Sequence, residues 1–241
     1  MAYNYLSLTN DVCRRLNETE LSPSTFDGAG GHYGIIKDSV NYSIRDINLD
    51  QYKWPFNLVV YDQPLTAGEN RYSYPSNYKI ENLNSFRIQE SDVFNNRTTW
   101  LVPKDYNEYL KYRIDEEYDT NESNRRLPRY VFKGNGLDFV ISPIPDQNYV
   151  LSYEYYQTPA DLSLPTDVPL LPEQFRSTIV EGAMYYNYLF RRDNENTQIS
   201  GMSFRELVGR MRSIYINKQE YVRSTMIDRP WMTETNGGYI Y

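Results

Sequence analysis

The sequence has few of the side chains on which metal and nucleophile chemistry depends. Its 241 residues include one cysteine, Cys13, and one histidine, His32. A single cysteine excludes an internal disulfide and a metal site built from several thiolates, and a single histidine excludes a zinc centre that needs a histidine pair. The Cys13–His32 dyad is the one thiol–imidazole pair that the chain can offer. We therefore expect no metal site and no cofactor.

Cationic charge and long apolar runs are also scarce. Lys and Arg number 25 against 32 Asp and Glu, which gives a formal net charge of -7. Non-specific nucleic-acid affinity comes from excess cationic side chains, so this balance argues against a general phosphate-binding protein. No run approaches the roughly 18 apolar residues of a membrane span, and the opening residues lack the features of a signal peptide. We expect a soluble chain, made inside the cell, with no membrane partner.

Tyrosine, by contrast, is abundant. The chain has 25 tyrosines among 241 residues, and the apolar residues that remain without them are few for a core of this size. Tyrosine buries a large ring while its hydroxyl still needs a partner or water, and it is enriched where chains meet. Two interpretations follow and are not exclusive: the core uses tyrosine at its margins, or much tyrosine surface contacts other chains.

Helical periodicity occurs near both ends of the chain. An N-terminal helix is followed by a second one from about residue 33 to 52, and two C-terminal helices are expected from 172 to about 191 and from 204 to 221. The residues expected to face the core are Leu8, Val12 and Leu16 in the first helix, Ile36, Val40, Ile44 and Ile47 in the second, Phe175, Ile179, Ala183, Tyr186 and Phe190 in the third, and Leu207, Val208, Met211, Ile214 and Tyr215 in the fourth.

Between these helices, short β-prone runs alternate with turns. Gly134-Asn135-Gly136 separates two of the runs and predicts a β-hairpin. The expected strands are Leu58–Tyr61, Arg71–Tyr74, Leu83–Ile88, Trp100–Val102, Arg129–Lys133, Leu137–Ser142 and Tyr149–Tyr156.

One short helix is expected within this β-rich region. Pro103 suits the first turn of a helix, which is predicted from about Lys104 to Tyr112. A charged loop from Asp115 to Arg126 follows it. The side chains expected to face inward are Tyr106, Tyr109 and Leu110.

This order of elements predicts an α+β fold, with a helical bundle built from both chain ends, an inserted β-rich lobe and an extended C-terminal arm. The bundle is expected because the flanking helices can bury their apolar faces only against one another. The predicted parts are the N-terminal helices of the bundle (1–55), the β-rich inserted lobe with one short helix (56–158), a proline-rich linker with the C-terminal helices of the bundle (159–223), and the extended docking arm (224–241).

The predicted arm has no useful periodicity but is rich in large apolar residues. Disordered segments are poor in such residues, so we interpret the segment as an arm that docks on another surface. The alternative is that it packs on its own domain. The residues proposed for docking are Met226, Ile227, Trp231, Met232, Tyr239, Ile240 and Tyr241.

Three sets of residues resemble functional motifs, and each has a plainer interpretation. The glycine-rich segment 28–34 lacks the preceding strand of a dinucleotide-binding turn and the Lys-Ser/Thr end of a P-loop, so it predicts a helix connection.

Glu18 with Glu20, or Asp115–Glu117, could supply the acid and base of a glycosidase, but such a pair must face across a cleft. The arginine pairs indicate solvated faces first and oligomer contacts second; they are Arg125 with Arg126, Arg191 with Arg192, and Arg210 with Arg212. No catalytic residue is predicted.

The order of the segments resembles a head-to-tail adaptor of tailed bacteriophages, of the short-tailed type called connector or tail tubular protein. The resemblance begins at Tyr5–Asn17 (YLSLTNDVCRRLN) and continues through a helix that ends near Trp54-Pro55-Phe56. A β lobe then leads to Tyr155–Leu162 (YYQTPADL). The segment Asp167–Phe175 (DVPLLPEQF) precedes a helix with Gly182-Ala183 at its middle. These motifs are short, but they agree in order and spacing from about residue 5 to 223.

The resemblance implies a non-enzymatic structural protein of the virion, made in the host cytoplasm and placed at the head–tail junction. Such adaptors form homo-oligomeric rings, commonly dodecamers, that join the portal protein to the tail nozzle or tail tube. Viral DNA passes through the lumen without specific binding, and a ring of chains this acidic would repel DNA phosphates. In the family a C-terminal extension often reaches the portal, which matches the position of Ser224–Tyr241.

Other functions remain open at this point. One is a different structural role in the tail. A tail-associated peptidoglycan hydrolase would need acidic residues such as Glu18 and Glu20 for catalysis. A carbohydrate-binding module would stack sugars on exposed aromatic rings, for which Trp54, Trp100 and Trp231 are the candidates.

Overall fold

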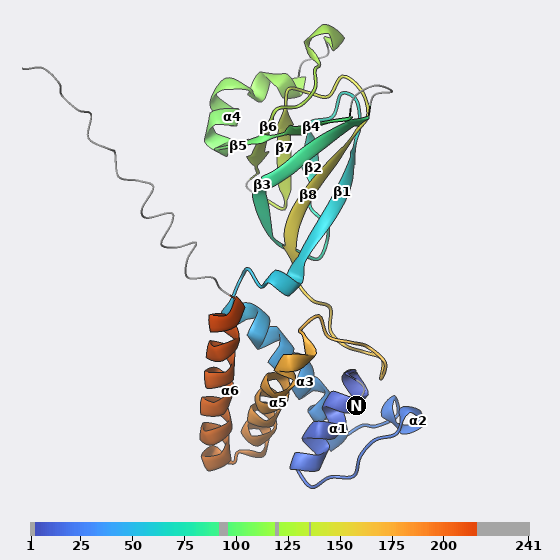
Figure 1. The fold of residues 1–241 in the computed structure, drawn as a ribbon, viewed down its shortest axis with the longest axis vertical. Coiled ribbons are helices and arrows are strands. Elements are labelled where there is room, and N and C mark those ends of the chain that lie inside the picture. The colour runs from blue at the N-terminus through green and yellow to red at the C-terminus, as the bar shows by residue number, and fades with distance from the viewer. Residues whose placement is uncertain (1–2, 92–95, 119–120, 135, 216–241) are drawn as a thin grey trace, which may run out of the picture.

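The computed structural model describes residues 3–91, 96–118, 121–134 and 136–215. Figure 1 shows two lobes joined by a narrow waist, with α1, α3, α5 and α6 in one lobe and the labelled strands in the other. The sheets and the long helices α1, α3, α5 and α6 are therefore segregated along the long axis of the molecule, with the short helix α4 on the side of the sheets. Such segregation is typical of an α+β fold, and the predicted fold class is confirmed.

The helical lobe is built from segments near both ends of the described chain. Helix α5 contacts α6, α3 and α1, so it is the central helix of this lobe. The elements are α1 (Tyr5–Arg15), α2 (Pro23–Phe26), α3 (His32–Asp50), the short 3-10 helix η4 (Glu173–Phe175), α5 (Arg176–Arg191) and α6 (Asn194–Tyr215).

Polar and charged side chains cap both ends of helix α1. The side chain of Asn4 accepts a hydrogen bond from the backbone nitrogen of Ser7 (2.9 Å), and the Ser7 hydroxyl accepts one from the nitrogen of Asn4 (3.2 Å), which completes a capping box. Arg14 and Arg15 occupy the last turn, where cations interact favourably with the helix dipole. The buried face of α1 packs against α3 and α5.

Three helices meet at Gly182, in the middle of α5. A Cβ atom at this position would stand 2.9 Å from Cβ of Ser43 in α3 and 2.7 Å from Cε2 of Phe204 in α6. Only a residue without a side chain fits between these neighbours. The predicted inward residues of α3 are all buried in the core of this lobe: Ile36, Val40, Ile44 and Ile47.

The β-rich lobe contains two four-stranded sheets, with the orders β1-β8-β3-β4 and β2-β7-β6-β5. The pair β5–β6 is parallel, and the antiparallel pair β6–β7 confirms the predicted hairpin. A 3-10 helix, η1 (Pro55–Asn57), leads into the first strand. The strands are β1 (Leu58–Leu65), β2 (Arg71–Ser73), β3 (Tyr78–Ser91), β4 (Asn96–Trp100), β5 (Val102–Lys104), β6 (Tyr130–Lys133), β7 (Asp138–Ser142) and β8 (Tyr149–Gln157).

Aromatic rings fill the space between the two sheets. Tyr153 stacks on Phe86 with 4.7 Å between ring centroids, and Phe139 lies 5.5 Å and 5.3 Å from these two rings. Tyrosine therefore serves the core itself and not only its margins. The buried tyrosines among the described residues are Tyr5, Tyr72, Tyr74, Tyr109, Tyr153 and Tyr155.

Helix α4 (Tyr106–Tyr112) packs on the β-rich lobe through Tyr109, which is fully buried and lies 5.2 Å from the ring of Phe132. The prediction that Pro103 opens this helix is wrong. Pro103 lies in β5 at the edge of its sheet, where a residue without an N–H is tolerated. The side chain of Asp105 caps the helix instead. The predicted charged loop that follows contains two 3-10 helices, η2 (Ile114–Tyr118) and η3 (Glu122–Asn124).

Three side chains predicted to face the core are exposed. Phe190 is 62% exposed because it lies in the last turn of α5, where the bundle ends. Ile214 is 65% exposed because it flanks the buried stripe of α6. Leu110 is exposed because α4 contacts the lobe through the face that carries Tyr109.

The sequence patterns also missed two helical segments. Helix α6 begins at Asn194, ten residues before the predicted start at Phe204, because Asp193 binds the nitrogen of Asn196 (3.2 Å) and its carbonyl accepts from Thr197 (2.9 Å). The short helix α2 was not expected either. It buries Phe26, whose ring lies 5.1 Å from that of Tyr5.

In the described residues the chain crosses the waist twice, at 51–57 and at 157–161. Trp54 is fully buried there and donates from Nε1 to the carbonyl of Ile47 (2.7 Å). Lys79 of β3 donates to the carbonyls of Asn48 and Gln51, at 3.2 Å for the second. A cation at the C-terminal end of α3 satisfies carbonyls that the helix leaves unpaired, so it ties the two lobes together.

Candidate functional site

The structure does not assemble Cys13 and His32 into a nucleophile–base pair. The Cys13 thiol is fully buried in the helical core, and burial, with smaller contributions from Glu18 and Glu20, raises its pKa to about 11. The thiol is therefore protonated at neutral pH and unreactive. The ring of His32 lies at the surface, with Nε2 placed 2.6 Å from Nη2 of Arg191.

Across the described residues, no three or more His, Cys, Asp or Glu side chains come together in a way that could hold a metal ion. The helices within the same ranges include none that is long and apolar enough to cross a membrane.

The carboxylates considered as an acid–base pair are bound by arginines at the surface. Glu18 lies 3.2 Å from Arg191, and Glu20 lies 2.9 Å from Arg14. In the Asp115–Glu117 cluster, Glu116 pairs with Arg113 (2.8 Å) and Glu117 with Arg71 (2.6 Å). These contacts are those of structural ion pairs.

The glycine-rich segment 28–34 is a helix connection. Gly31 has a φ of 60° and precedes the first residue of α3. A side chain at Gly28, Gly30 or Gly34 would meet no atom within 4 Å, so these glycines form no cradle around a ligand.

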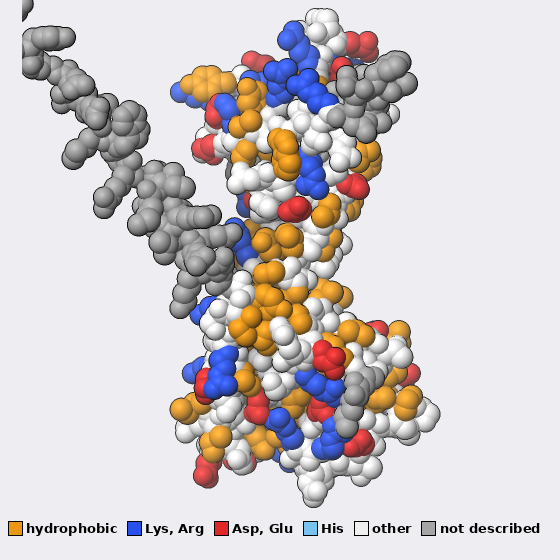
Figure 2. Space-filling view, in the orientation of Figure 1, with side chains coloured by type: hydrophobic (Ala, Val, Ile, Leu, Met, Phe, Trp, Pro, Cys, Tyr) orange, Lys and Arg blue, Asp and Glu red, His pale blue; other side chains and the backbone are white. Residues whose placement is uncertain are grey.

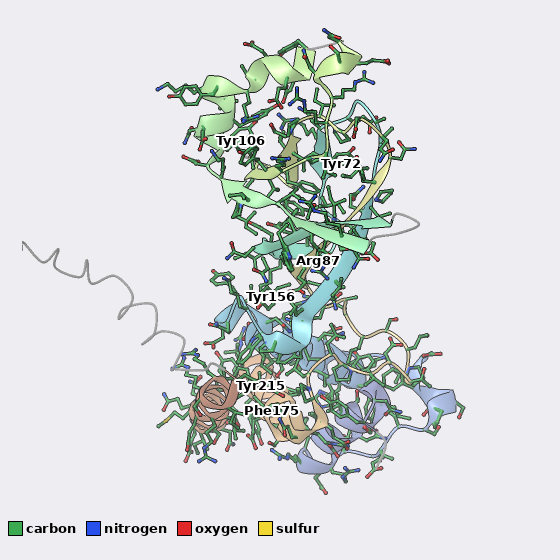
Figure 3. All side chains as sticks on the ribbon, turned by 45° about the horizontal axis from the view of Figure 1, so that its top comes forward. Tyr72, Arg87, Tyr106, Tyr156, Phe175 and Tyr215 are labelled. Carbon is green, nitrogen blue, oxygen red and sulfur yellow. The ribbon has the colours of Figure 1, made fainter. Side chains whose placement is uncertain are left out.

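The three tryptophans considered for sugar stacking differ in their environments. Trp54 belongs to the core, and Trp231 lies outside the described residues. Trp100 is exposed at the edge of its sheet, with the guanidinium of Arg87 5.7 Å from its ring centroid. Arg87, labelled in Figure 3, also lies 3.7 Å from Glu154. Among the tryptophans of the described residues, Trp100 is thus the exposed one.

The surface of the described chain carries many large apolar side chains. Figure 2 shows them gathered at the waist and scattered over the helical lobe on the face in view. Exposed apolar patches of this kind mark sites where other chains bind. The exposed set includes Tyr42, Leu49, Tyr52, Val60, Trp100, Tyr112, Val168, Leu189, Phe190, Ile199, Met202 and Ile214.

Helix α3 has an outward stripe in addition to its buried face. Tyr42, Arg45 and Leu49 follow one another at spacings of three and four residues and therefore lie along one side of the helix, and Tyr52 follows two residues after the helix ends at Asp50. We call them the α3 stripe. Leu49 is 66% exposed and Tyr52 is 63% exposed. The positions predicted for this helix are its inward residues only. The helical spacing of the stripe is the signal that reveals it.

A groove of about 380 Å³ lies beside the α3 stripe and is mainly apolar. We call it the waist groove. Ile44, Leu49 and Tyr52 form one wall, and Thr158–Asp161, where the chain returns from β8, forms the other. Arg45 joins the walls, since its Nε lies 2.8 Å from Oδ1 of Asp161.

Helix α6 also carries exposed apolar side chains at Ile199, Met202 and Ile214, which we call the α6 face. Met202 is 71% exposed. The opposite side of the helix is buried at Phe204, Val208 and Met211. The described helical lobe thus has apolar side chains on two different helices that it does not cover itself.

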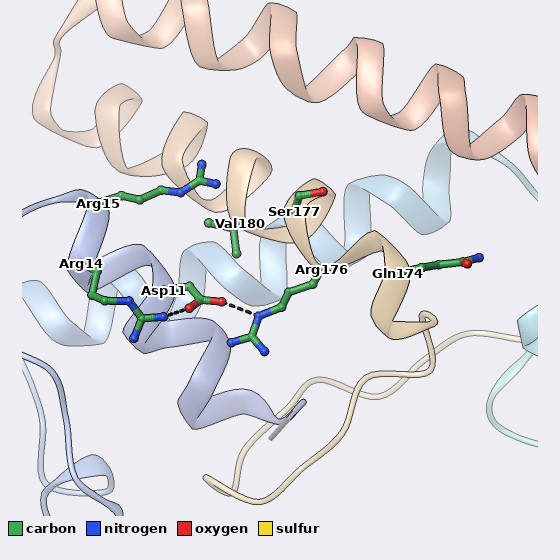
Figure 4. Close-up of a pocket in the computed structure, with 7 residues that line it drawn as sticks. All are labelled: Asp11, Arg14, Arg15, Gln174, Arg176, Ser177 and Val180. Atoms are coloured by element: carbon green, nitrogen blue, oxygen red, sulfur yellow. Dashed lines mark hydrogen bonds and ion pairs between the residues drawn. The ribbon is translucent and has the colours of Figure 1, made fainter. Parts of the chain in front are cut away.

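A charged hollow of about 590 Å³ lies between α1 and the start of α5 (Figure 4). Arg14, Arg15 and Arg176 line it, and Asp11 binds both Arg14 and Arg176. Arg15 in turn pairs with Glu181 of α5. Because every one of these guanidinium groups has a carboxylate partner in its own chain, the hollow serves to hold α1 against α5.

An elongated α+β chain with buried or paired reactive groups and uncovered apolar surfaces on two helices is typical of a structural protein that assembles with other chains. The chain matches the family model described as SU10 adaptor protein over residues 3–230. It therefore belongs to the SU10 adaptor protein family, and the resemblance to a phage head-to-tail adaptor is confirmed at that level. The curated proteins include none that matches the chain.

Proposed function

We propose that the chain is a structural adaptor that forms a ring, dodecameric in the family pattern, between the portal and the tail nozzle or tail tube of a virion. The family match over residues 3–230 carries this proposal. An adaptor joins other proteins and needs no active site, which agrees with the buried thiol and paired carboxylates of the described chain.

The uncovered apolar surfaces support side-by-side assembly. A ring needs two different surfaces on each subunit, so that one surface of a copy meets the other surface of its neighbour. The α3 stripe and the α6 face lie on two helices that both pack on α5. We assign the lateral contacts of the ring to these two surfaces.

The C-terminal arm is proposed to bind the portal. Its residues Met226, Ile227, Trp231, Met232, Tyr239, Ile240 and Tyr241 lie outside the described residues. The support for this role is their apolar character and the C-terminal extension of the family that the chain resembles. We further propose that the ring lumen is acidic, because each chain contributes a net charge of -7, and that viral DNA therefore slides past without binding.

The test is to sediment the purified chain with the portal ring from the same genome and to weigh the complex. We expect a mass gain of one chain per portal subunit. A chain that lacks 224–241 should bring no gain. As a matched control, replacing Met226, Ile227, Trp231 and Met232 with serine should abolish binding, while serine at Thr225, Thr233, Thr235 and Asn236 should not.

Lateral contacts are tested separately from portal binding. Met202→Glu places a charge on the α6 face and should prevent ring closure, whereas Leu164→Glu changes another exposed apolar residue, in the 159–172 linker, and should have no effect. If an intact portal binds neither the full chain nor its rings, we would instead assign the protein to a more distal position in the tail.

A further inference from the structure

We propose that, before assembly, the arm segment Met226–Met232 binds in the waist groove of its own chain and leaves that groove when it meets the portal. This inference deepens the proposed function, since it names a second, internal partner for the same arm. Two observations support the inference: the apolar lining of the groove and the position of the last described residue.

The waist groove has the properties of a binding site for apolar side chains. Its volume of about 380 Å³ lies within the range of ligand sites, roughly 300–1000 Å³. Leu49 and Tyr52 line it while about two thirds of their own surface is exposed, at 66% and 63%. Within the described chain the ammonium group of Lys79 lies over the ring of Tyr52, 5.5 Å from its centroid, and the rest of this apolar area faces water unless another segment binds there.

The described chain ends near the C-terminal end of α3, whose residues Asn48 and Leu49 line the groove. Arg212, in the last turn of α6, forms an ion pair with Asp50, the residue that follows Leu49. Tyr215, the last described residue, lies 6.0 Å from Phe56 between ring centroids. In Figure 3 the label of Tyr215 stands beside that of Phe175 at the end of the helical lobe that faces the waist, and the two rings are 5.5 Å apart.

The distance from this point to the groove is short for the chain that follows. Tyr215 and Arg212 are three residues apart on a helix, a rise of about 4.5 Å. Met226 follows Tyr215 by 11 residues, which can span roughly 36 Å when extended. The segment can therefore reach the groove of its own chain without strain, and the short linker gives it a high effective concentration there.

The composition of the segment fits the lining of the groove. Met226, Ile227, Trp231 and Met232 supply apolar side chains of adaptable shape, and Trp231 alone can fill much of the available volume. Occupation of the groove would shield both the arm and the α3 stripe in a free subunit. Since the stripe is also proposed as a ring contact, release of the arm would expose a lateral contact where the portal is present.

Hydrogen exchange on the free chain tests the proposal without any portal. The full chain is compared with a chain that ends at Arg223, at a concentration where both are monomeric. We expect residues 49–53 and 158–161 to exchange about fivefold faster in the shortened chain, and the region around Ile199 and Met202 to be unchanged. Equal exchange at the groove in the two chains would overturn the proposal.

A pair of substitutions supplies a second readout. In a Trp100→Phe background, the remaining tryptophans are buried Trp54 and Trp231 of the arm. Leu49→Ser with Tyr52→Ser should shift the fluorescence emission to the red, as Trp231 moves into water. Ile199→Ser with Met202→Ser changes residues of comparable exposure away from the groove and should leave the emission unchanged.

The outcomes separate this inference from the proposed function. If the protection of the groove residues from hydrogen exchange disappears when the protein is diluted, the arm of a second copy binds there. That result would overturn binding within one chain. Absence of protection together with normal portal binding would refute only the internal site. Protection without any portal binding would refute only the adaptor role of the arm.

Discussion

Ser43 of α3 lies directly against Gly182 of α5, with no space between them for a side chain. A Cβ atom at Gly182 would come within 2.9 Å of Cβ of Ser43 and 2.7 Å of Phe204 in α6. The position therefore fixes how closely three helices approach, and a single methyl group must push at least one of them away.

Gly182→Ala should destabilise the chain by about 1–3 kcal/mol, because overpacking forces side chains and backbone to shift. The matched control is Gly209→Ala in α6, where an added Cβ would meet no atom within 4 Å. That change should be neutral or stabilise by up to about 1 kcal/mol through helix propensity. Urea unfolding of both variants provides the measurement, and equal midpoints would contradict the packing argument.

The carboxylate of Asp167 organises the linker that passes α1. It accepts hydrogen bonds from the backbone nitrogens of Ser163 and Leu164, each at 2.8 Å, and these bonds lower the pKa of the carboxyl below its usual 3.8. The carbonyl of the same residue accepts from the nitrogen of Tyr5 (2.7 Å). Protonation of Asp167 should therefore loosen the linker.

Because the pKa in the folded state is the lower one, Asp167 stabilises the fold above about pH 4, and this contribution is lost as the pH falls through the folded-state pKa. Asp167→Asn should lower the unfolding midpoint at pH 7 and reduce its dependence on pH between 5 and about 3. Asp27→Asn, at an exposed carboxylate, is the control and should follow the wild-type curve. If the unfolding midpoints of wild type and Asp167→Asn depend on pH in the same way, the charge of Asp167 does not stabilise the fold.

Cys13 should not react with thiol reagents in the folded protein. Its side chain is fully buried, and burial is the main cause of a pKa of about 11, so little thiolate is present or accessible at pH 8. We expect labelling by a disulfide reagent only after addition of denaturant. Rapid labelling of the native chain would place the thiol at the surface.

Lys79→Met should weaken the connection between the lobes. The substitution keeps the length of the side chain but removes the donor to the carbonyls of Asn48 and Gln51, with a loss of about 1 kcal/mol. Protease cleavage within residues 51–57 should then become faster. Lys53→Met, at an exposed position in the same segment, should leave the cleavage rate unchanged.

Periodicity predicted the elements whose burial follows a regular pattern. Helix α3 buries Ile36, Val40, Ile44 and Ile47 as expected, and β8 buries Leu151, Tyr153 and Tyr155 at alternate positions. These predictions succeed because one face of each element contacts the core along its length. The turn chemistry of Gly134-Asn135-Gly136 likewise predicted the β6–β7 pair.

Features set by tertiary contacts were not predictable in this way. Pro103 fits both a helix start and an edge strand, and only the parallel pairing with β6 decides between them. Phe190 has the right spacing for the core but lies where the bundle ends. The waist groove depends on residues 158–161 lying beside α3, more than a hundred positions away in the chain, so no local pattern contains it.

The connectivity of the two lobes also sets the order in which they can be completed during synthesis. Tyr3 donates a hydrogen bond to the carbonyl of Leu171, 168 residues further along the chain, and α1 and α3 pack on α5. The helices made first therefore cannot bury their apolar faces until α5 has left the ribosome. Strands β1 to β8 are all contained within 58–157, so the β-rich lobe can close while the N-terminal helices still lack their partner. Long-range closure of this kind slows folding, and the segments translated first wait longest for their packing partner.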